Sequence, residues 1–352
     1  MTADPLTATG RTLRWGVVST GSIARRVTSE IQALADAEVV AVSSRDQARA
    51  AAFAAELGIS RAYGDEDGVP GYLRLAADPD VEVVYVATPH GQHHEVTKAL
   101  LEAGKHVLVE KSFTINAAEA EDLVATARKR GVFLMEAVWT RFLPAYRRTL
   151  EILESGEIGE VRFVQADLAF IAATDGRDRL WTKEAGGGAL LDLAVYPLTW
   201  VIGALGFPES VHATGKLNRD GVDETVAMQL DYTGGAKAQV LVSFVSQSTR
   251  QARICGTGGT IVTDAALTRP EGLTVTSMTG TVGRGEATSR HEHLPCVAQP
   301  YAYQLREVTR RVQQGASECE QMPLDDTLRT MRLLDEVRRH IGLVYPNDAR
   351  TT

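Results

Sequence analysis

The chain of 352 residues has few cysteines, no excess of basic residues and no long apolar run. Its three cysteines, Cys255, Cys296 and Cys319, lie far apart without CxxC spacing, which excludes a disulfide framework and a cysteine zinc site. The net charge of −8 argues against nucleic-acid and anionic-membrane partners, which need a basic face. No run of 18 apolar residues occurs, and residues 1–12 lack the pattern of a signal peptide. We therefore predict a cytoplasmic protein.

The length and the hydrophobic pattern indicate two domains of different construction. Short apolar runs alternate with helical periods over residues 13–136, which is typical of a doubly wound parallel sheet. Strand-like segments without intervening helices occupy residues 209–293 and favour an antiparallel sheet. We predict an α/β protein with a flexible segment 1–12, a Rossmann domain 13–136, and an α+β domain 137–352 with a large, mostly antiparallel open sheet.

The predicted elements can be given by residue range. In the first domain we expect strands at 13–19, 38–43, 81–87, 106–109 and 132–136, and helices at 23–35, 46–57, 93–103 and 117–130. Beyond it we expect a helix at 144–155, a strand at 161–170, and closing helices at 299–314 and 324–341.

A turn that contains one glycine, VVSTGSIA, joins the first predicted strand to the first helix. Its spacing, Ser-x-Gly-x-x-Ala, is one step from the dinucleotide-binding pattern. Gly21 would let the backbone approach a pyrophosphate, and Ala24 would let the helix pack closely against the strand. Ser19 stands where the first glycine is usual and predicts a turn without positive φ at that residue. Taken alone, the turn fits a pyrophosphate site and a plain strand–helix connection equally well.

The end of the second predicted strand favours NADP(H) as the cofactor. Enzymes that use NAD carry an acidic residue at this place to bind the ribose, whereas this chain has Ser43, Ser44 and Arg45. A hydroxyl and a guanidinium suit a 2′-phosphate. The alternative is a polar helix cap followed by a solvated charge. Because the turn and this strand belong to one βαβ unit, we interpret the turn as a pyrophosphate site.

Two further places offer groups for acid–base chemistry. Glu110 and Lys111 come directly after an apolar strand, at the sheet edge where ligands bind, and a partly buried lysine can serve in proton transfer. Asp192 and Tyr196 lie four residues apart, on one face of an otherwise apolar helix. The alternatives are a solvated surface lysine and a Tyr–Asp hydrogen bond that only satisfies a core.

Five segments together resemble the Gfo/Idh/MocA family of oxidoreductases, over residues 13–346. They are STGSIA, ATPHGQHHE, GKHVLVEKS, MEAVWTRFLP and GGGALLDLAVYP. The last two look most like the branch of dimeric dihydrodiol dehydrogenase and NADP-dependent D-xylose dehydrogenase. Ser112 replaces the proline of the family signature, and a cis Lys–Ser bond at that place would cost roughly 2.5–4 kcal/mol.

The resemblance implies an NADP-dependent dehydrogenase or reductase that transfers a hydride between the nicotinamide and a carbon of a sugar, polyol or trans-dihydrodiol. It implies that Tyr196 and Lys111 handle the proton with support from Asp192. The residues expected at the cofactor are Gly21, Ser22, Ile23, Ala24, Ser44, Arg45, Thr88, His90, His93, Glu110 and Lys111. Those expected at the substrate are Trp139, Arg141, Phe170, Arg179, Trp181 and Tyr196. A homo-oligomer, dimer or tetramer, is implied as well.

The histidines raise the question of a metal site. His90, His93 and His94 lie together, and His291 and His293 would share one face of a strand. Adjacent positions on a helix do not direct two imidazoles to one ion, so no metal is predicted.

Two other functions compete with the dehydrogenase. An NADP-binding sensor or regulatory protein would have this fold without turnover, because fold alone does not establish activity. The complete set of Lys111, Asp192 and Tyr196 favours an enzyme. A nucleotide-binding methyltransferase also uses a glycine-rich turn, but Ser44 and Arg45 in place of an acidic ribose ligand disfavour it.

Overall fold

The computed structural model describes residues 4–173, 179–280 and 285–350. They form two compact units: residues up to 139 together with 297–331 make unit 1, and residues 140–296 together with 332–350 make unit 2. Segment 297–331 thus groups with the first unit, although the predicted boundary assigned everything after residue 136 to the second domain.

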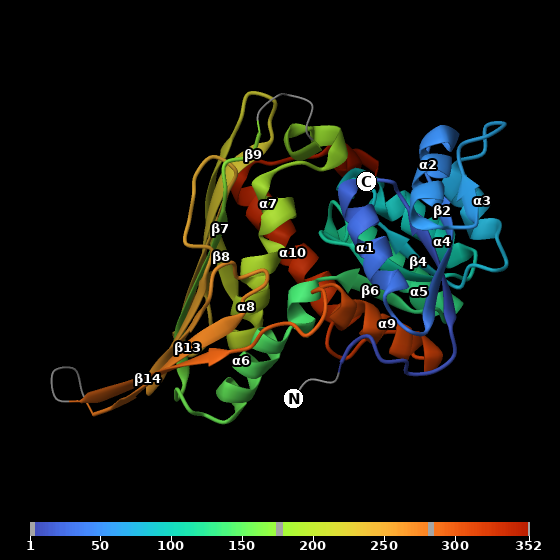
Figure 1. The fold of residues 1–352 in the computed structure, drawn as a ribbon. Helices are drawn as coiled ribbons and strands as arrows, with labels where there is room; N and C mark the ends of the chain where they lie inside the picture. The colour runs from blue at the N-terminus through green and yellow to red at the C-terminus, as the bar shows by residue number, and fades with distance from the viewer. Residues whose placement is uncertain (1–3, 174–178, 281–284, 351–352) are drawn as a thin grey trace. The chain divides into compact units, whose positions relative to one another are not determined.

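Unit 1 is built on a six-stranded parallel sheet in the order β3-β2-β1-β4-β5-β6 (Figure 1). The central strands are buried on both faces because helices cover them. The order reverses between β1 and β4, which is the switch point where doubly wound sheets bind ligands. The strands are β1 (Leu13–Val18), β2 (Ala37–Ser43), β3 (Arg61–Tyr63), β4 (Val83–Val86), β5 (His106–Glu110) and β6 (Leu134–Ala137).

The helices of unit 1 include one from the end of the chain. α9 packs against α1. Its Arg306 pairs with buried Asp36 at 2.6 Å and donates from Nε to the carbonyl of Pro5 at 2.8 Å. The described part of the segment predicted to be flexible is therefore held by hydrogen bonds, among them that of the Thr9 N–H to Asp36 at 2.7 Å. The helices are α1 (Ser22–Gln32), α2 (Gln47–Leu57), α3 (Gly71–Ala77), the short η1 (His90–Gln92), α4 (His93–Glu102), α5 (Ala117–Arg130) and α9 (Ala302–Gln313).

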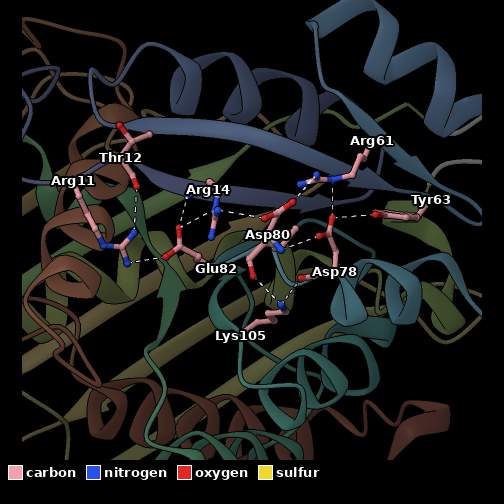
Figure 2. A network of polar contacts seen from close by, with 10 residues as sticks. Arg11, Thr12, Arg14, Arg61, Tyr63, Asp78, Asp80, Glu82 and Lys105 are labelled. Carbon is pink, nitrogen blue, oxygen red and sulfur yellow. Dashed lines mark hydrogen bonds and ion pairs between the residues drawn. The ribbon is translucent and has the colours of Figure 1, made fainter.

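A network of charged side chains lies where the strands of unit 1 begin (Figure 2). Arg61 pairs with Asp78 at 2.8 Å and with Asp80 at 3.0 Å. Lys105 donates to the carbonyls of Asp78 and Val81 at 2.6 and 2.8 Å, and burial lowers its pKa. These groups connect loops at the amino edge of the sheet, so they are separate from the carboxyl edge where a ligand is expected.

Unit 2 contains an eight-stranded sheet in the order β14-β13-β12-β11-β7-β10-β9-β8 (Figure 1). Neighbouring strands are antiparallel except β7 and β10, so the predicted mostly antiparallel open sheet is confirmed. The strands are β7 (Val161–Ala169), β8 (Ser210–Leu217), β9 (Asp223–Asp231), β10 (Lys237–Ser243), β11 (Ala252–Gly256), β12 (Gly259–Thr263), β13 (Gly272–Thr279) and β14 (Glu286–His293).

The helix predicted to carry Asp192 and Tyr196 is divided in two. α7 (Ala189–Leu193) and α8 (Val195–Leu205) meet at Ala194, whose backbone is itself helical. Pro197 has no N–H to donate to the carbonyl of Leu193, which accounts for the break. The other helices with residues in unit 2 are α6 (Pro144–Glu154), α10 (Leu324–Ile341) and the short η2 (Trp139–Phe142), η3 (Arg179–Trp181), η4 (Lys183–Ala185) and η5 (Pro346–Arg350).

Among the described residues, no single helix has the length and apolar character needed to cross a membrane. One bent pair of helical segments, Lys183–Leu193 and Val195–Leu205, meets those two criteria together at an angle of 41°.

Candidate functional site

Unit 1 has a pocket of about 490 Å³ at the carboxyl ends of β1, β2 and β4. Of the predicted cofactor residues, Gly21, Ser44, Arg45 and Thr88 line its wall. The others are not among the described residues of that wall: Ser22, Ile23, Ala24, His90, His93, Glu110 and Lys111. Ala24 is fully buried on α1, in agreement with a packing role.

The turn at the switch point differs from the prediction at one residue. The expectation of a backbone without positive φ at Ser19 is wrong, because its φ is +115°. The side chain compensates locally: Ser19 Oγ accepts the N–H of Gly21 at 3.2 Å. Serine thus holds a conformation that favours glycine, as is common at functional sites. No side chain caps α1 at Gly21, so its first N–H groups suit an anion.

The end of β2 presents two guanidinium groups to the pocket. Ser44, Arg45 and Arg49 line the wall, and Arg49 was missed because it lies within α2 rather than at the strand end. The nearby carboxylate of Asp46 is engaged at the start of α2, where it accepts the N–H groups of Ala48 and Arg49 at 2.8 and 3.1 Å. These two guanidinium groups are donors of the kind that bind a phosphate.

Two buried hydroxyls in the pocket wall test the fit of a dinucleotide. Ser43 Oγ and Thr88 Oγ1 have no hydrogen-bond partner among the described residues, although both are buried. Buried polar atoms are normally satisfied, so these two are suited to a bound polar ligand. With the uncapped start of α1 and the guanidinium groups, the residues fit a dinucleotide cofactor.

Backbone contacts from two histidines hold the segment that carries Lys111. His90 Nε2 lies 3.1 Å from the Lys111 carbonyl oxygen. Buried His93 bridges two loops: its Nδ1 lies 2.9 Å from the carbonyl oxygen of Ser112, and its Nε2 lies 2.8 Å from the carbonyl oxygen of Thr88. The Lys111–Ser112 peptide bond is cis. Both histidines therefore act on the backbone around a half-buried lysine.

Glu110 and Glu136 brace the same segment. Buried Glu110 accepts the hydroxyl of Tyr85 at 2.6 Å and the N–H of Lys111 at 3.3 Å. Glu136 accepts the N–H of Phe113 at 3.1 Å. The described residues contain no group of three or more histidines, cysteines and carboxylates arranged to hold a metal ion.

Unit 2 brings several of the predicted substrate residues together. Both terminal nitrogens of Arg179 lie 3.4 Å from Asp192 Oδ1, and Asp192 is buried. Phe170 and Trp181 both pack on Phe244, with ring centroids 5.4 Å apart in each pair. Phe244 was missed because it follows β10, which pairs with β7 across a long stretch of sequence.

Three candidates remain, Trp139, Arg141 and Tyr196. Trp139, in unit 1, stacks on Tyr301 with 4.6 Å between ring centroids and 24° between planes. Arg141 and Tyr196, in unit 2, are half-buried.

Asp223 is a buried carboxyl that nothing in the sequence distinguished. Its Oδ2 accepts the N–H of Leu190 at 2.6 Å, at the start of the helix that carries Asp192. Gly188 has φ +121°, and a Cβ there would lie 1.9 Å from Asp223 Oδ1. Burial raises the pKa of Asp223 to about 7. The glycines before α7 thus allow a close approach of this carboxyl.

The sheet order and the turn at its switch point define a dinucleotide-binding protein with a second, large-sheet unit. Residues 13–138 match the family model described as oxidoreductase family, NAD-binding Rossmann fold, and residues 146–262 match the GFO/IDH/MocA C-terminal domain. The chain belongs to the GFO/IDH/MocA oxidoreductase family, and the predicted resemblance is confirmed.

Relatives of nearly the same length carry the name trans-1,2-dihydrobenzene-1,2-diol dehydrogenase. That of Mus musculus is 38% identical over 352 residues, and that of Bos taurus is 37% identical over 351, each covering 96% of this chain and 99% of its own. The KijD10 3-ketoreductase of Actinomadura kijaniata, solved with NADP and TDP-benzene, has a TM-score of 0.80 at 29% identity over 94% of this chain and 98% of its own. Aldose-aldose oxidoreductase of Caulobacter crescentus, at 24% identity, TM-score 0.82 and the same coverage, shares the fold.

Proposed function

We propose that the chain is an NADP-dependent dehydrogenase or reductase acting on a small sugar, polyol or trans-dihydrodiol, by hydroxyl–carbonyl interconversion or oxidation of the diol. The observation that carries the proposal is the pocket of unit 1. The turn at Gly21 and the guanidinium groups of Arg45 and Arg49 line it, together with two hydroxyls that have no partner within the described part of the chain. The names of the dihydrodiol dehydrogenases and of the NADP-bound 3-ketoreductase support it.

The charges at the end of β2 support NADP over NAD. A 2′-phosphate is matched by Arg45, Arg49 and the Ser44 hydroxyl, whereas the hydroxyl of an unphosphorylated ribose needs a carboxylate acceptor. The Asp46 carboxylate is the acidic group in this wall nearest the strand end, and it already accepts two backbone N–H groups of α2. We therefore expect Arg45→Ala to weaken NADP binding and to leave NAD binding nearly unchanged.

When bound, NADP supplies the hydride-transfer chemistry. We assign the proton transfer to Tyr196. A free phenol has a pKa of ~10, which is too high for an efficient base at neutral pH, so this role needs the Lys111 ammonium nearby to stabilise the phenolate. Lys111 stabilises negative charge developing on that oxygen, with direct proton transfer as its second role. Asp192, which pairs with Arg179, orients the proton-transfer group. His90 and His93 hold the backbone on both sides of the Lys111–Ser112 bond.

The aromatic group of unit 2 supports a ring-shaped substrate. Phe170, Trp181 and Phe244 pack together, and aromatic faces suit the apolar face of a sugar ring as well as an aryl diol. Trp181 and Arg179 belong to one short helix, η3 (Arg179–Trp181), so an apolar ring and a charged donor occur together there. This composition favours a neutral polyhydroxylated ring over a fatty substrate.

We further propose a cytoplasmic homo-oligomer joined through the sheet of unit 2. The face of this sheet has a hollow of about 620 Å³, lined by polar and apolar side chains such as Gln165, Gln239 and Leu241. Alternate residues of β10 are exposed, as expected of a sheet that covers a core on one face only. Light scattering of the purified chain tests this proposal, and a monomer at all concentrations would contradict it.

The test of the activity uses Tyr196→Phe. Reduction of NADP is measured with a panel of trans-dihydrodiols, aldoses and polyols, and NADPH binding by fluorescence. We expect kcat to fall by about 10²–10⁴-fold, the size of a lost general acid–base contribution, while the Kd for NADPH stays within about twofold. Tyr232→Phe is the matched control, because its hydroxyl contacts the carbonyl of Gly206 in the same unit.

Equal loss of turnover and NADPH binding, or loss of neither, would contradict the assignment of Tyr196. NADPH binding without turnover of any substrate would instead favour a sensor or regulatory protein of the same fold.

A further inference from the structure

The nucleotide pocket has a wall for which the proposed function gives no role. α3 contributes Tyr72 to it, η1 contributes Gln92, and α4 contributes Glu95 and Val96. The hydroxyl of Tyr72 donates to Glu95 Oε1 at 2.8 Å, so the two helices meet in a hydrogen bond at the pocket surface. A carboxylate at a site for a polyanionic cofactor is unfavourable unless it binds a donor.

The pair is arranged to present a hydrogen-bond acceptor. Burial of the half-buried ring, and then its bond to Glu95, raises the pKa of Tyr72 to about 12, so the phenol keeps its proton and donates it at neutral pH. A carboxylate has two oxygens with several lone pairs, so one bond to a phenol leaves acceptor capacity for a second donor. The phenol also restricts the rotamer of an otherwise exposed glutamate.

The proposed placement of the phosphates leaves this wall for the base. A pyrophosphate at Gly21 and a 2′-phosphate at Ser44 and Arg45 fix both ends of the adenosine ribose. The remainder of the pocket, which Pro70, Tyr72, Gln92, Glu95 and Val96 line, is then left for the base attached to that ribose. Adenine carries one amino group, at N6, and this group is a hydrogen-bond donor.

We propose that Glu95 accepts a hydrogen bond from the N6 amino group of adenine and thereby determines the base specificity of the cofactor site. Tyr72 is a positioning residue that holds the carboxylate for this contact. The inference rests on the proposed function, since it needs NADP in this pocket.

Nicotinamide hypoxanthine dinucleotide phosphate is the probe. Its base has an oxygen at the 6-position, which is an acceptor and faces the carboxylate unfavourably. Binding of NADP and of this analogue to the full chain is measured by calorimetry. We expect the parent to prefer NADP by about tenfold, the size of one hydrogen bond to a charged group at an exposed site.

Glu95→Gln should reduce this preference to within about twofold, because an amide offers both a donor and an acceptor to either base. Glu102→Gln is the matched control: it changes the same charge on the same helix but lies outside the pocket, and it should retain the tenfold preference. Tyr72→Phe keeps the ring and removes the donor, and we expect a preference of about threefold.

Equal affinities of the parent for the two dinucleotides would overturn the inference, and so would an unchanged preference in Glu95→Gln. If Glu95→Gln weakened the binding of both dinucleotides by the same factor, the Tyr72–Glu95 bond would only link α3 to α4, and the inference would be overturned as well. NADP binding with no discrimination between bases contradicts this inference alone, whereas absence of NADP binding contradicts the proposed function as well.

Discussion

Replacing Asp223 by asparagine should change how the stability of unit 2 depends on pH. Asp223 is fully buried, and its Oδ2 accepts the N–H of Leu190 at 2.6 Å. Burial outweighs this bond and the positive charge of Arg338, and it raises the pKa of Asp223 from 3.8 to about 7. The unfolded chain therefore releases this proton at a lower pH than the folded protein does.

Between about pH 4 and pH 7 unfolding releases a proton from residue 223, so the free energy of unfolding falls as pH rises through this interval. Each pKa unit corresponds to about 1.4 kcal/mol. About two pH units of this interval lie above pH 5. The free energy of unfolding of the parent therefore falls by roughly 3 kcal/mol between pH 5 and pH 8 through this group alone. Asparagine does not ionise. It keeps an acceptor for Leu190 but places an amide nitrogen near the position of Oδ1, which has no hydrogen-bond partner among the residues described, at a pH-independent cost of about 1–3 kcal/mol.

We therefore expect the stability of Asp223→Asn, relative to the parent, to improve by roughly 3 kcal/mol from pH 5 to pH 8. Urea unfolding at several pH values, read by hydrogen exchange on peptides from α7 and β9, measures this difference within unit 2. Asp220→Asn changes the charge of an exposed side chain just before β9 and should follow the parent. If the curves of Asp223→Asn and the parent run parallel over this range, the buried-carboxyl argument is wrong.

Two further variants test packing and charge. Gly188→Ala should lower the free energy of unfolding by about 3 kcal/mol, because its Cβ would lie 1.9 Å from Asp223 Oδ1 in a backbone with φ +121°. Gly206→Ala is the control: φ is +73° but a Cβ meets open space, so we expect a loss of about 1 kcal/mol. Equal losses of the two variants in urea unfolding would contradict this reasoning. Arg306→Met should destabilise unit 1 by roughly 3–5 kcal/mol at neutral pH by leaving buried Asp36 without its guanidinium. Despite burial, the hydrogen bonds from Arg306 and its neighbours hold the pKa of Asp36 well below its usual range, so the parent loses this stability on acidification and the variant should approach the parent at low pH in the same assay.

Much of the fold was predictable because the two periodicities are clear. Each predicted strand of the first domain overlaps an observed one, and α10 has the predicted bounds of Leu324–Ile341. β3 and α3 were missed because they are only three and seven residues long, too short to show a period. The return of 297–331 to unit 1 depends on long-range pairs such as Arg306 with Asp36, which no local pattern reveals.

The candidate site was predictable where chemistry is concentrated at strand ends. Gly21, Ser44 and Arg45 follow β1 and β2 directly, so the βαβ order placed them in one pocket. Arg49 and Glu95 reach the same pocket from within helices, where a charged residue is usually a solvated one. Asp223 is important because it is fully buried at the first position of β9, and burial of a strand's first residue is a tertiary property.

The division of unit 1 into two stretches of sequence has a consequence for the order in which the protein can be made. Synthesis from the N-terminus completes the six-stranded sheet by residue 137, but α9 follows only after all strands of the other sheet. Until then the nascent first unit exposes the Asp36 carboxylate and the bare side of α1, without the guanidinium of Arg306. A fragment ending at residue 139 would keep this defect permanently, so its folding should require residues 297–331 supplied as a separate peptide.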